Sequence, residues 1–252
     1  MSKLAITMCL VSLLAGCSVH DEDRVAMAQQ EALSINALSI NALSSDVFVL
    51  DPGVSNGLEN SEEGREALRY LSRCALADGQ ILSVEVEGVV HEFPGLLGLA
   101  DEWVSQPLDA DEARALSACL LAHINAYGVS VPISLRGGEL TADQSEEDLY
   151  GLHEAAFYGT LLSGTPRMYV CSATDATTAR AVSSDRSWRV CSEVQRGQMS
   201  KCNSWGSMFI VTGACDQVCS QYTDGVGWSQ CYAPDTGEVH EHTINSWLID
   251  NL

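Results

Sequence analysis

The sequence predicts an α+β fold, in which a mixed domain of helices and antiparallel sheet is joined to a disulfide-rich, strand-rich C-terminal third. Two segments between residues 61 and 127 carry apolar side chains at helical spacing, and a hairpin pattern lies between them. From Arg167 onward, short strand patterns alternate with Ser, Thr, Asp and Gly, and six of the ten cysteines lie there. A region with so small a core of its own needs covalent cross-links.

The first seventeen residues have the layout of an export signal. Lys3 supplies a positive charge, Leu4–Leu14 is an apolar run of eleven residues interrupted by Thr7 and Ser12, and small residues lead to Cys17. As a helix this run would cover about 16 Å, roughly half of the hydrocarbon core of a bilayer. We therefore expect residues 1–16 to be a cleaved signal peptide. A secretory signal followed by a chance cysteine is the alternative.

Composition and charge restrict the possible partners. The 252-residue chain has 13 Lys and Arg against 34 Asp and Glu, a formal net charge of −21, and 46% hydrophobic residues. That hydrophobic content is enough for a folded core. Nucleic-acid binding requires clustered positive charge, so we expect no nucleic-acid partner. The acidity is typical of a soluble exported domain.

The cysteines divide by position. Cys9 is lost with the signal, and Cys17 becomes the first mature residue. The remaining even number of cysteines predicts a disulfide framework, because an exported protein meets an oxidising environment. The spacing of Cys215 and Cys219 also occurs among zinc ligands, which is the alternative. The predicted disulfide cysteines are Cys74, Cys119, Cys171, Cys191, Cys202, Cys215, Cys219 and Cys231.

We expect residues 17–59 to form a flexible tether. The segment is polar and contains the short repeat Ala32–Asn36, repeated at Ala37–Asn41. So few short copies cannot stack into a solenoid. The predicted organisation continues with an α+β domain at 60–166 and a cysteine-rich strand region, packed on it, at 167–252.

The first half of the folded chain predicts two helices around a hairpin. A helix is expected from Ser61 to Ala77, with Asn60 as its cap. Residues 81–86 and 89–93 flank Glu87-Gly88, which suits a tight turn. The second helix is expected at 110–127.

The second helix begins with a capping box, since Asp109 and Glu112 have the required spacing. Cys74 and Cys119 each lie on the apolar face of their helix, which predicts a disulfide between them. His123 lies on the same face and is expected to be a core residue rather than a ligand.

The later elements follow from shorter patterns. A strand is expected at 129–135, and a helix is expected to begin at Ser145 and to continue through Leu161. His153 and Glu154 fall in that helix without the second histidine of a zinc protease. The predicted strands of the last third are Met168–Cys171, Trp188–Cys191, Met208–Thr212, Trp228–Tyr232 and Ile244–Ile249.

Motifs for catalysis are sparse. The sequence has no serine nucleophile elbow, phosphate-binding loop or dinucleotide fingerprint, so no cofactor is expected. His240 and His242 would share one face of a strand and grip a metal, although a polar loop is the simpler interpretation. Aromatic residues of the last third would be binding anchors or core: Trp188, Trp205, Tyr222, Trp228 and Tyr232.

The ending Leu13-Leu14-Ala15-Gly16-Cys17 resembles the lipobox of bacterial lipoproteins. Together with the Leu-Ser-x-Asn repeat, the stretch 112–137 and the cysteine-rich strands, it resembles uncharacterised lipoproteins of gliding, predatory-type bacteria. The resemblance implies lipidation of Cys17, and Ser18 after it implies sorting to the outer membrane. It implies no activity.

We therefore expect an exported outer-envelope lipoprotein, held to the outer membrane by its lipid anchor. Its expected role is non-enzymatic, either binding an envelope protein or glycan or supporting the envelope structurally. The alternative is a metal-assisted envelope hydrolase whose site combines His153, Glu154, His240 and His242.

Overall fold

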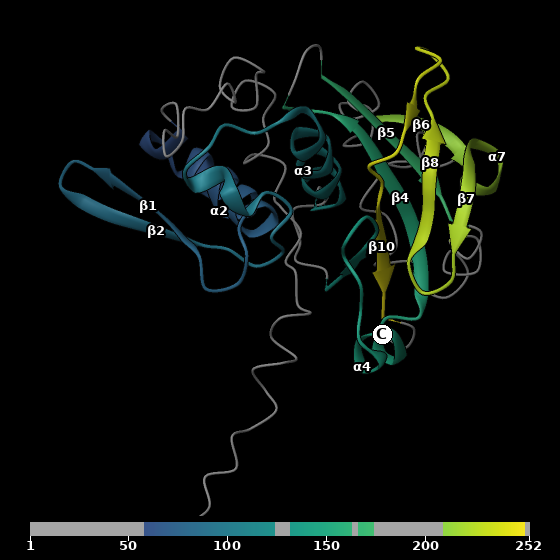
Figure 1. Cartoon of the computed structure of the whole chain (residues 1–252), viewed down its shortest axis with the longest axis horizontal. Helices are drawn as coiled ribbons and strands as arrows, with labels where there is room; N and C mark the ends of the chain where they lie inside the picture. The colour runs from purple at the N-terminus through teal and green to yellow at the C-terminus, as the bar shows by residue number, and fades with distance from the viewer. Residues whose placement is uncertain (1–57, 124–131, 163–165, 174–208, 250–252) are drawn as a thin grey trace, which may run out of the picture.

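The computed structural model describes residues 58–123, 132–162, 166–173 and 209–249 (Figure 1). In this part of the chain, two helices and a projecting hairpin lie beside a five-stranded sheet, and a three-stranded sheet follows. The α+β class with a strand-rich, disulfide-containing C-terminal region is confirmed. The predicted signal peptide, most of the tether and the predicted strand Trp188–Cys191 lie outside the described residues.

The first long helix, α2 (Glu62–Ala75), follows the 3-10 turn η1 (Leu58–Asn60). Its cap differs from the sequence prediction: the side chain of Ser61, not Asn60, accepts a hydrogen bond from the Gly64 N–H at 2.9 Å. Asn60 is still part of η1, so the chain turns into the helix one residue later. This hydrogen bond satisfies a backbone N–H that has no acceptor within the first turn of the helix.

The hairpin of β1 (Ile81–Val86) and β2 (Val89–Pro94) forms as predicted. Val86 pairs with Val89, which leaves Glu87 and Gly88 as a two-residue loop. Both have positive φ, 52° and 82°, as a type I′ turn requires. At the base of the hairpin, Leu82 and Phe93 are paired and buried in the larger core.

Helix α3 (Ala110–His123) begins with the predicted capping box, after the 3-10 turn η2 (Asp101–Val104). The Asp109 carboxylate accepts from the Glu112 N–H at 2.8 Å, and the Glu112 carboxylate accepts from the Asp109 N–H at 2.8 Å. The predicted Cys74–Cys119 disulfide is present and ties α2 to α3. Residues 124–127, which the sequence also assigned to this helix, lie outside the described part.

The five-stranded sheet has the order β3-β10-β4-β5-β6, with β4 at its centre. The neighbours are antiparallel except for the parallel pair of β5 and β6. Helix α3 packs against β4. The strands are β3 (Ser134–Arg136), β4 (Leu152–Thr160), β5 (Arg167–Ser172), β6 (Phe209–Ala214) and β10 (Ile244–Leu248).

The predicted helix from Ser145 to Leu161 is wrong. A short helix, α4 (Gln144–Leu149), is capped by Asp143, whose side chain accepts from the Glu146 N–H at 2.9 Å, and strand β4 follows from Leu152. Seven consecutive residues of β4 are buried, so the strand lacks the polar alternation that identifies half-exposed strands. At Gly159 the strand has no room for a side chain, because a Cβ there would lie 2.1 Å from the Arg167 carbonyl oxygen.

The three-stranded sheet is formed by β7 (Cys219–Thr223), β8 (Gly227–Tyr232) and β9 (Val239–His240). The one-turn helix α7 (Cys215–Val218) connects β6 to β7. Between this sheet and β4–β5 lies a smaller core of aromatic and cysteine side chains. The larger core, under α2 and α3, contains residues from both sides of position 166.

Candidate functional site

The histidine and carboxylate of β4 are engaged in structural contacts. His153 Nε2 lies 3.0 Å from Asn245 Oδ1, and its ring stacks on Trp247 with centroids 4.3 Å apart. Glu154 accepts a hydrogen bond from the Ser246 hydroxyl at 2.7 Å. Asn245 and Ser246 are adjacent residues of β10 and point to opposite faces of the sheet, so the two side chains that contact them diverge.

The other two histidines lie in different surroundings. His240 is buried beside the stacked rings of Tyr158 and Tyr169, with centroid distances of 5.6 and 5.5 Å. Burial lowers its pKa from the ordinary value, and the neighbouring Glu238 opposes this shift. His242 Nε2 lies 3.4 Å from the Asp111 carboxylate on α3.

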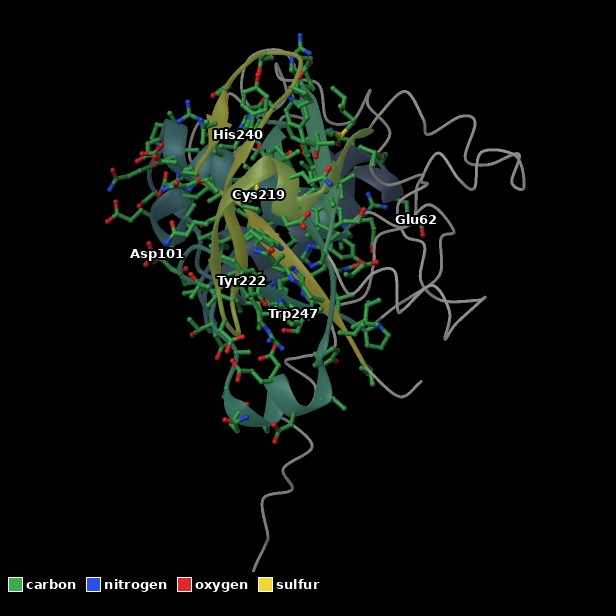
Figure 2. The ribbon with its side chains drawn as sticks, turned by 90° about the vertical axis from the view of Figure 1, so that its right-hand side faces the viewer. Glu62, Asp101, Cys219, Tyr222, His240 and Trp247 are labelled. Atoms are coloured by element: carbon green, nitrogen blue, oxygen red, sulfur yellow. A yellow bond between two sulfur atoms is a disulfide. The ribbon has the colours of Figure 1, made fainter. Side chains whose placement is uncertain are left out.

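The four side chains of the metal-site alternative are therefore not brought together. Two groups of three potential ligand atoms within 4.8 Å occur among the described residues, and neither contains any of the four. Figure 2 places His240 well away from Trp247, on which His153 stacks. The structure assembles no hydrolytic centre from His153, Glu154, His240 and His242.

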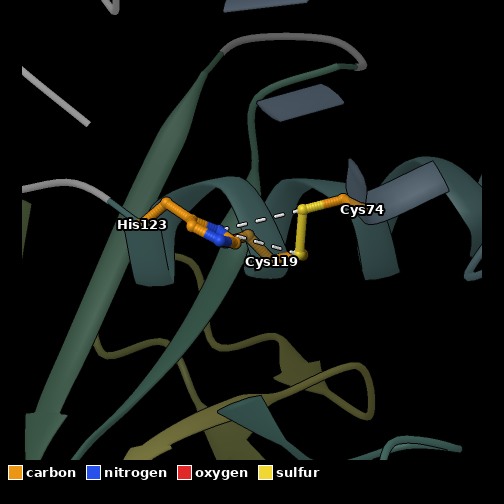
Figure 3. A group of neighbouring side chains, drawn as sticks. All are labelled: Cys74, Cys119 and His123. Atoms are coloured by element: carbon orange, nitrogen blue, oxygen red, sulfur yellow. Dashed lines mark hydrogen bonds between the residues drawn. A yellow bond between two sulfur atoms is a disulfide. The ribbon is translucent and has the colours of Figure 1, made fainter. Parts of the chain in front are cut away.

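The first of the two groups consists of Cys74, Cys119 and His123 (Figure 3). His123 Nδ1 lies 3.9 Å from each sulfur and donates to the Cys119 carbonyl oxygen at 2.9 Å. The sulfurs form a disulfide and are not thiolate ligands. His123 is fully buried, as the sequence predicted for a core residue.

The second group belongs to the smaller core. Disulfides join Cys171 to Cys215 and Cys219 to Cys231, and all four residues are buried. The sequence did not distinguish these pairings from the other possibilities. Cys191 and Cys202 lie outside the described residues.

The predicted aromatic anchors divide between surface and core. Tyr222 and Tyr232 are exposed, and Trp228 is half-buried with its ring 4.9 Å from that of Tyr222. Tyr222 also lies 6.3 Å from His153, at the edge of the stack that continues to Trp247. Trp188 and Trp205 lie outside the described part of the chain.

No protein-family model, curated protein or solved structure matches this chain. No helix in the described ranges combines the length and apolar character needed to cross a membrane.

The most prominent unassigned feature is the β1–β2 hairpin, which projects from the body beside α2 (Figure 1). Val89 and Val90 at its outer end are 57% and 58% exposed, and Ile81 on β1 is also exposed. Its base is fixed by the buried pair Leu82 and Phe93. The hairpin is thus anchored in the core at its base and exposes valines to solvent at its outer end.

The edges and charges of this hairpin fit a binding element. It is a two-stranded sheet, and neither outer edge pairs with another strand in the described residues. Glu85, Glu87 and Glu92 are exposed on it, whereas residues 81–94 contain no Lys or Arg. Free edges of this kind are normally blocked by lysine or covered. A partner segment that is extended and positively charged would pair with this edge and be attracted by the glutamates.

Sequence reasoning identified the hairpin but not its exposed valines. A signal was present: adjacent Val89 and Val90 on one strand must point to opposite faces, so one valine lies on each side of the sheet. Such a thin sheet can bury only one of its faces against the body.

Proposed function

We propose that the protein is a lipid-anchored outer-membrane protein with a non-enzymatic binding role, and that the β1–β2 hairpin is its binding element. Its partner is an extended, basic and apolar segment of another envelope protein. This proposal rests on the exposed valines and on strand edges that pair with no other strand in the described part of the chain.

Anchoring follows from the lipobox at residues 13–17, with Cys17 as the lipidated residue. The three disulfides among the described residues support an oxidising location, because cytosolic proteins seldom keep structural disulfides. Cys17→Ser abolishes incorporation of labelled palmitate and releases the protein from the membrane fraction. An unmodified N-terminus in the cytosolic fraction would contradict the anchoring.

Strand addition explains how the hairpin binds. A segment that pairs with an open edge gains main-chain hydrogen bonds, and alternate side chains provide specificity. On this hairpin, valines offer apolar contact and the three glutamates attract a basic partner. A second copy of the same chain is disfavoured, since it would place like charges opposite one another.

The test uses the full-length protein in detergent micelles and a short labelled peptide of alternating valine and lysine. We expect saturable binding that weakens with added salt, because the attraction is between exposed charges. A valine–glutamate peptide of the same length should not bind. A valine–lysine peptide with methylated backbone nitrogens should also fail, since it cannot pair with the edge.

Variants locate the binding. Glu85→Gln/Glu92→Gln removes two negative charges from the hairpin. We expect affinity for the valine–lysine peptide to fall by about tenfold, which is equivalent to about 1.4 kcal/mol of binding free energy. The matched control is Glu139→Gln/Glu241→Gln, which removes two exposed carboxylates outside the hairpin. Equal losses in both variants, or equal binding of both peptides, would refute the hairpin as the binding element.

A further inference from the structure

Two disulfides of the smaller core are in direct contact with each other. Cys171 Sγ, from the Cys171–Cys215 disulfide, lies 3.7 Å from Cys219 Sγ, from the Cys219–Cys231 disulfide. The sulfurs of Cys171, Cys219 and Cys231 all lie within 4.8 Å of one another. Three sulfur atoms from the two disulfides thus form one buried cluster.

Local sequence produces this contact. Cys215 and Cys219 are the first residues of α7 and β7, so they lie at the two ends of a single helical turn. Cys171 reaches that turn from β5, and Cys231 reaches it from β8, where it is the direct cross-strand partner of Cys219. One short segment therefore anchors both disulfides.

We propose that these four cysteines form a thiol–disulfide exchange site, in which reduction of one disulfide is passed to its neighbour. The reductant is an exported dithiol, which opens Cys219–Cys231 and leaves two thiols. Cys219 is the most exposed of the four side chains at 7%, and the other three have no exposed surface. Access of the attacking thiol favours this disulfide as the entry point.

The second step is an internal exchange without net oxidation or reduction. The Cys219 thiolate attacks Cys171 Sγ, a Cys171–Cys219 bond forms, and the Cys171–Cys215 bond breaks. Cys215 leaves as a thiolate and takes up the proton that Cys219 released. The two electrons and two protons from the external dithiol end on the Cys215 and Cys231 thiols, and the external dithiol becomes a disulfide.

The exchange changes which elements are tied together. Before it, the bonds join β5 to α7 and β7 to β8. Afterwards, a single bond joins β5 of the five-stranded sheet to β7 of the three-stranded sheet. The β7–β8 pair and the α7 turn lose their covalent links, so the reduced form has a differently braced C-terminal region.

The decisive variant is Cys231→Ser in the full-length protein, purified oxidised and kept without added reductant. It leaves Cys219 as a free thiol beside an intact Cys171–Cys215 disulfide. After incubation, free thiols are blocked with N-ethylmaleimide before unfolding, and peptides are mapped by mass spectrometry. We expect a Cys171–Cys219 peptide and alkylation divided between Cys215 and Cys219. Alkylation of Cys219 alone, with Cys171–Cys215 intact, would overturn the proposal.

Two further measurements guard against a misfolded variant. The wild-type protein, treated with limiting dithiothreitol and blocked in the same way, should yield the Cys171–Cys219 peptide with Cys215 and Cys231 alkylated. The proposal would be overturned if the only products were native disulfides and cysteine pairs in which both thiols are alkylated. Retention of added zinc by the reduced cysteines with no rearranged peptide would also overturn it.

The matched control is Cys119→Ser, which leaves the Cys74 thiol. Among the described residues, the ligand group that contains Cys74 includes no sulfur besides that of Cys119, its own disulfide partner, so we expect alkylation of Cys74 alone. In Cys231→Ser, the exchange rate should also rise with pH, since the thiolate is the nucleophile. A rate independent of pH would point away from thiolate attack.

Discussion

The side chain of Asn245 on β10 pairs with the backbone of Trp228 on β8 and so joins the two sheets. Its Nδ2 donates to the Trp228 carbonyl oxygen at 3.0 Å, and its Oδ1 accepts from the Trp228 N–H at 2.9 Å. Oδ1 also accepts from His153 Nε2 at 3.0 Å, which places a proton on that nitrogen. Asn245 is fully buried, and Gly227 leaves room for it, because a Cβ there would lie 2.4 Å from Asn245 Cγ.

Asn245→Ala should therefore destabilise the fold by about 3 kcal/mol, because buried donors and an acceptor lose their partners. Gly227→Ala should have a comparable effect through steric displacement of the same side chain. Urea unfolding followed by circular dichroism measures both. Asn60→Ala, at an exposed asparagine, is the control and should change stability by less than about 0.5 kcal/mol. A loss no larger than that of the control would show that the sheets are joined by other contacts.

Arg136 braces the same region from β3. Its guanidinium donates to Ser134 Oγ at 2.9 Å, to the Gly225 carbonyl at 3.2 Å and to the Tyr150 carbonyl at 2.9 Å. It also lies over the Trp247 ring, 4.4 Å from the centroid. Burial lowers its pKa, while Glu146 and Glu147 oppose the shift.

Arg136→Lys should cost about 2 kcal/mol in unfolding free energy, since an ammonium group cannot donate in three fixed directions and also stack on a ring. The same unfolding assay applies. Arg114→Lys, at an exposed ion pair with Asp111, keeps its charge and should change stability by less than about 0.5 kcal/mol. Equal stability of the two variants would mean that positive charge alone suffices at position 136.

Local signals in the sequence predicted the first half of the fold. The hairpin turn and the Asp109 capping box depend on neighbouring residues, and the Cys74–Cys119 bond followed from two helix faces. Strand β4 was missed because a strand buried on both faces has no polar alternation, and its apolar residues also fit a helical repeat.

The contacts that join the sheets were beyond sequence reasoning for a different reason. Asn245 meets Trp228 through a side chain that imitates a backbone partner, and no spacing rule signals such a contact. The Cys171–Cys219 proximity likewise depends on the register of β7 with β8 and on where β5 ends. Both arise from tertiary pairing, which local patterns in a single sequence do not reveal.

His240 should make stability depend on pH. Its pKa is lowered in the folded state by burial, so the unfolded chain binds its proton first as the pH falls. The contribution of His240 to stability is therefore greatest above the ordinary histidine pKa of about 6.5 and declines as the pH falls below it. The pKa of His240 is also affected by nearby charges: Glu238 and Asp235 raise it, and Arg114 lowers it further.

We expect the unfolding free energy of the wild-type protein to fall between about pH 7.5 and pH 5.5, and His240→Phe to flatten that fall. The slope against pH is the measurement, because the phenyl ring also changes packing against Tyr158 and Tyr169. His242→Phe is the control, since His242 lies beside Asp111 and not against buried tyrosine rings. An unchanged slope in His240→Phe would contradict the assignment.

The hairpin turn offers a stabilising substitution. Glu87 has a φ of 52°, a left-handed conformation that glutamate adopts at a cost and asparagine tolerates. Glu87→Asn creates the preferred Asn-Gly pair and should raise stability by about 0.5 kcal/mol, or the midpoint temperature by about 1–2 °C. Glu85→Asn removes the same charge from an extended strand position and should lower stability instead.

Gly88→Ala separates backbone strain from crowding in that turn. A Cβ at Gly88 would meet nothing within 4 Å, so a steric clash with neighbours cannot explain any loss. Its φ of 82° nevertheless disfavours any residue with a side chain, and we expect a loss of about 1 kcal/mol. Thermal unfolding checks this together with Glu87→Asn. If Gly88→Ala is neutral while Glu87→Asn stabilises, removal of the negative charge rather than turn geometry governs the tip of the hairpin.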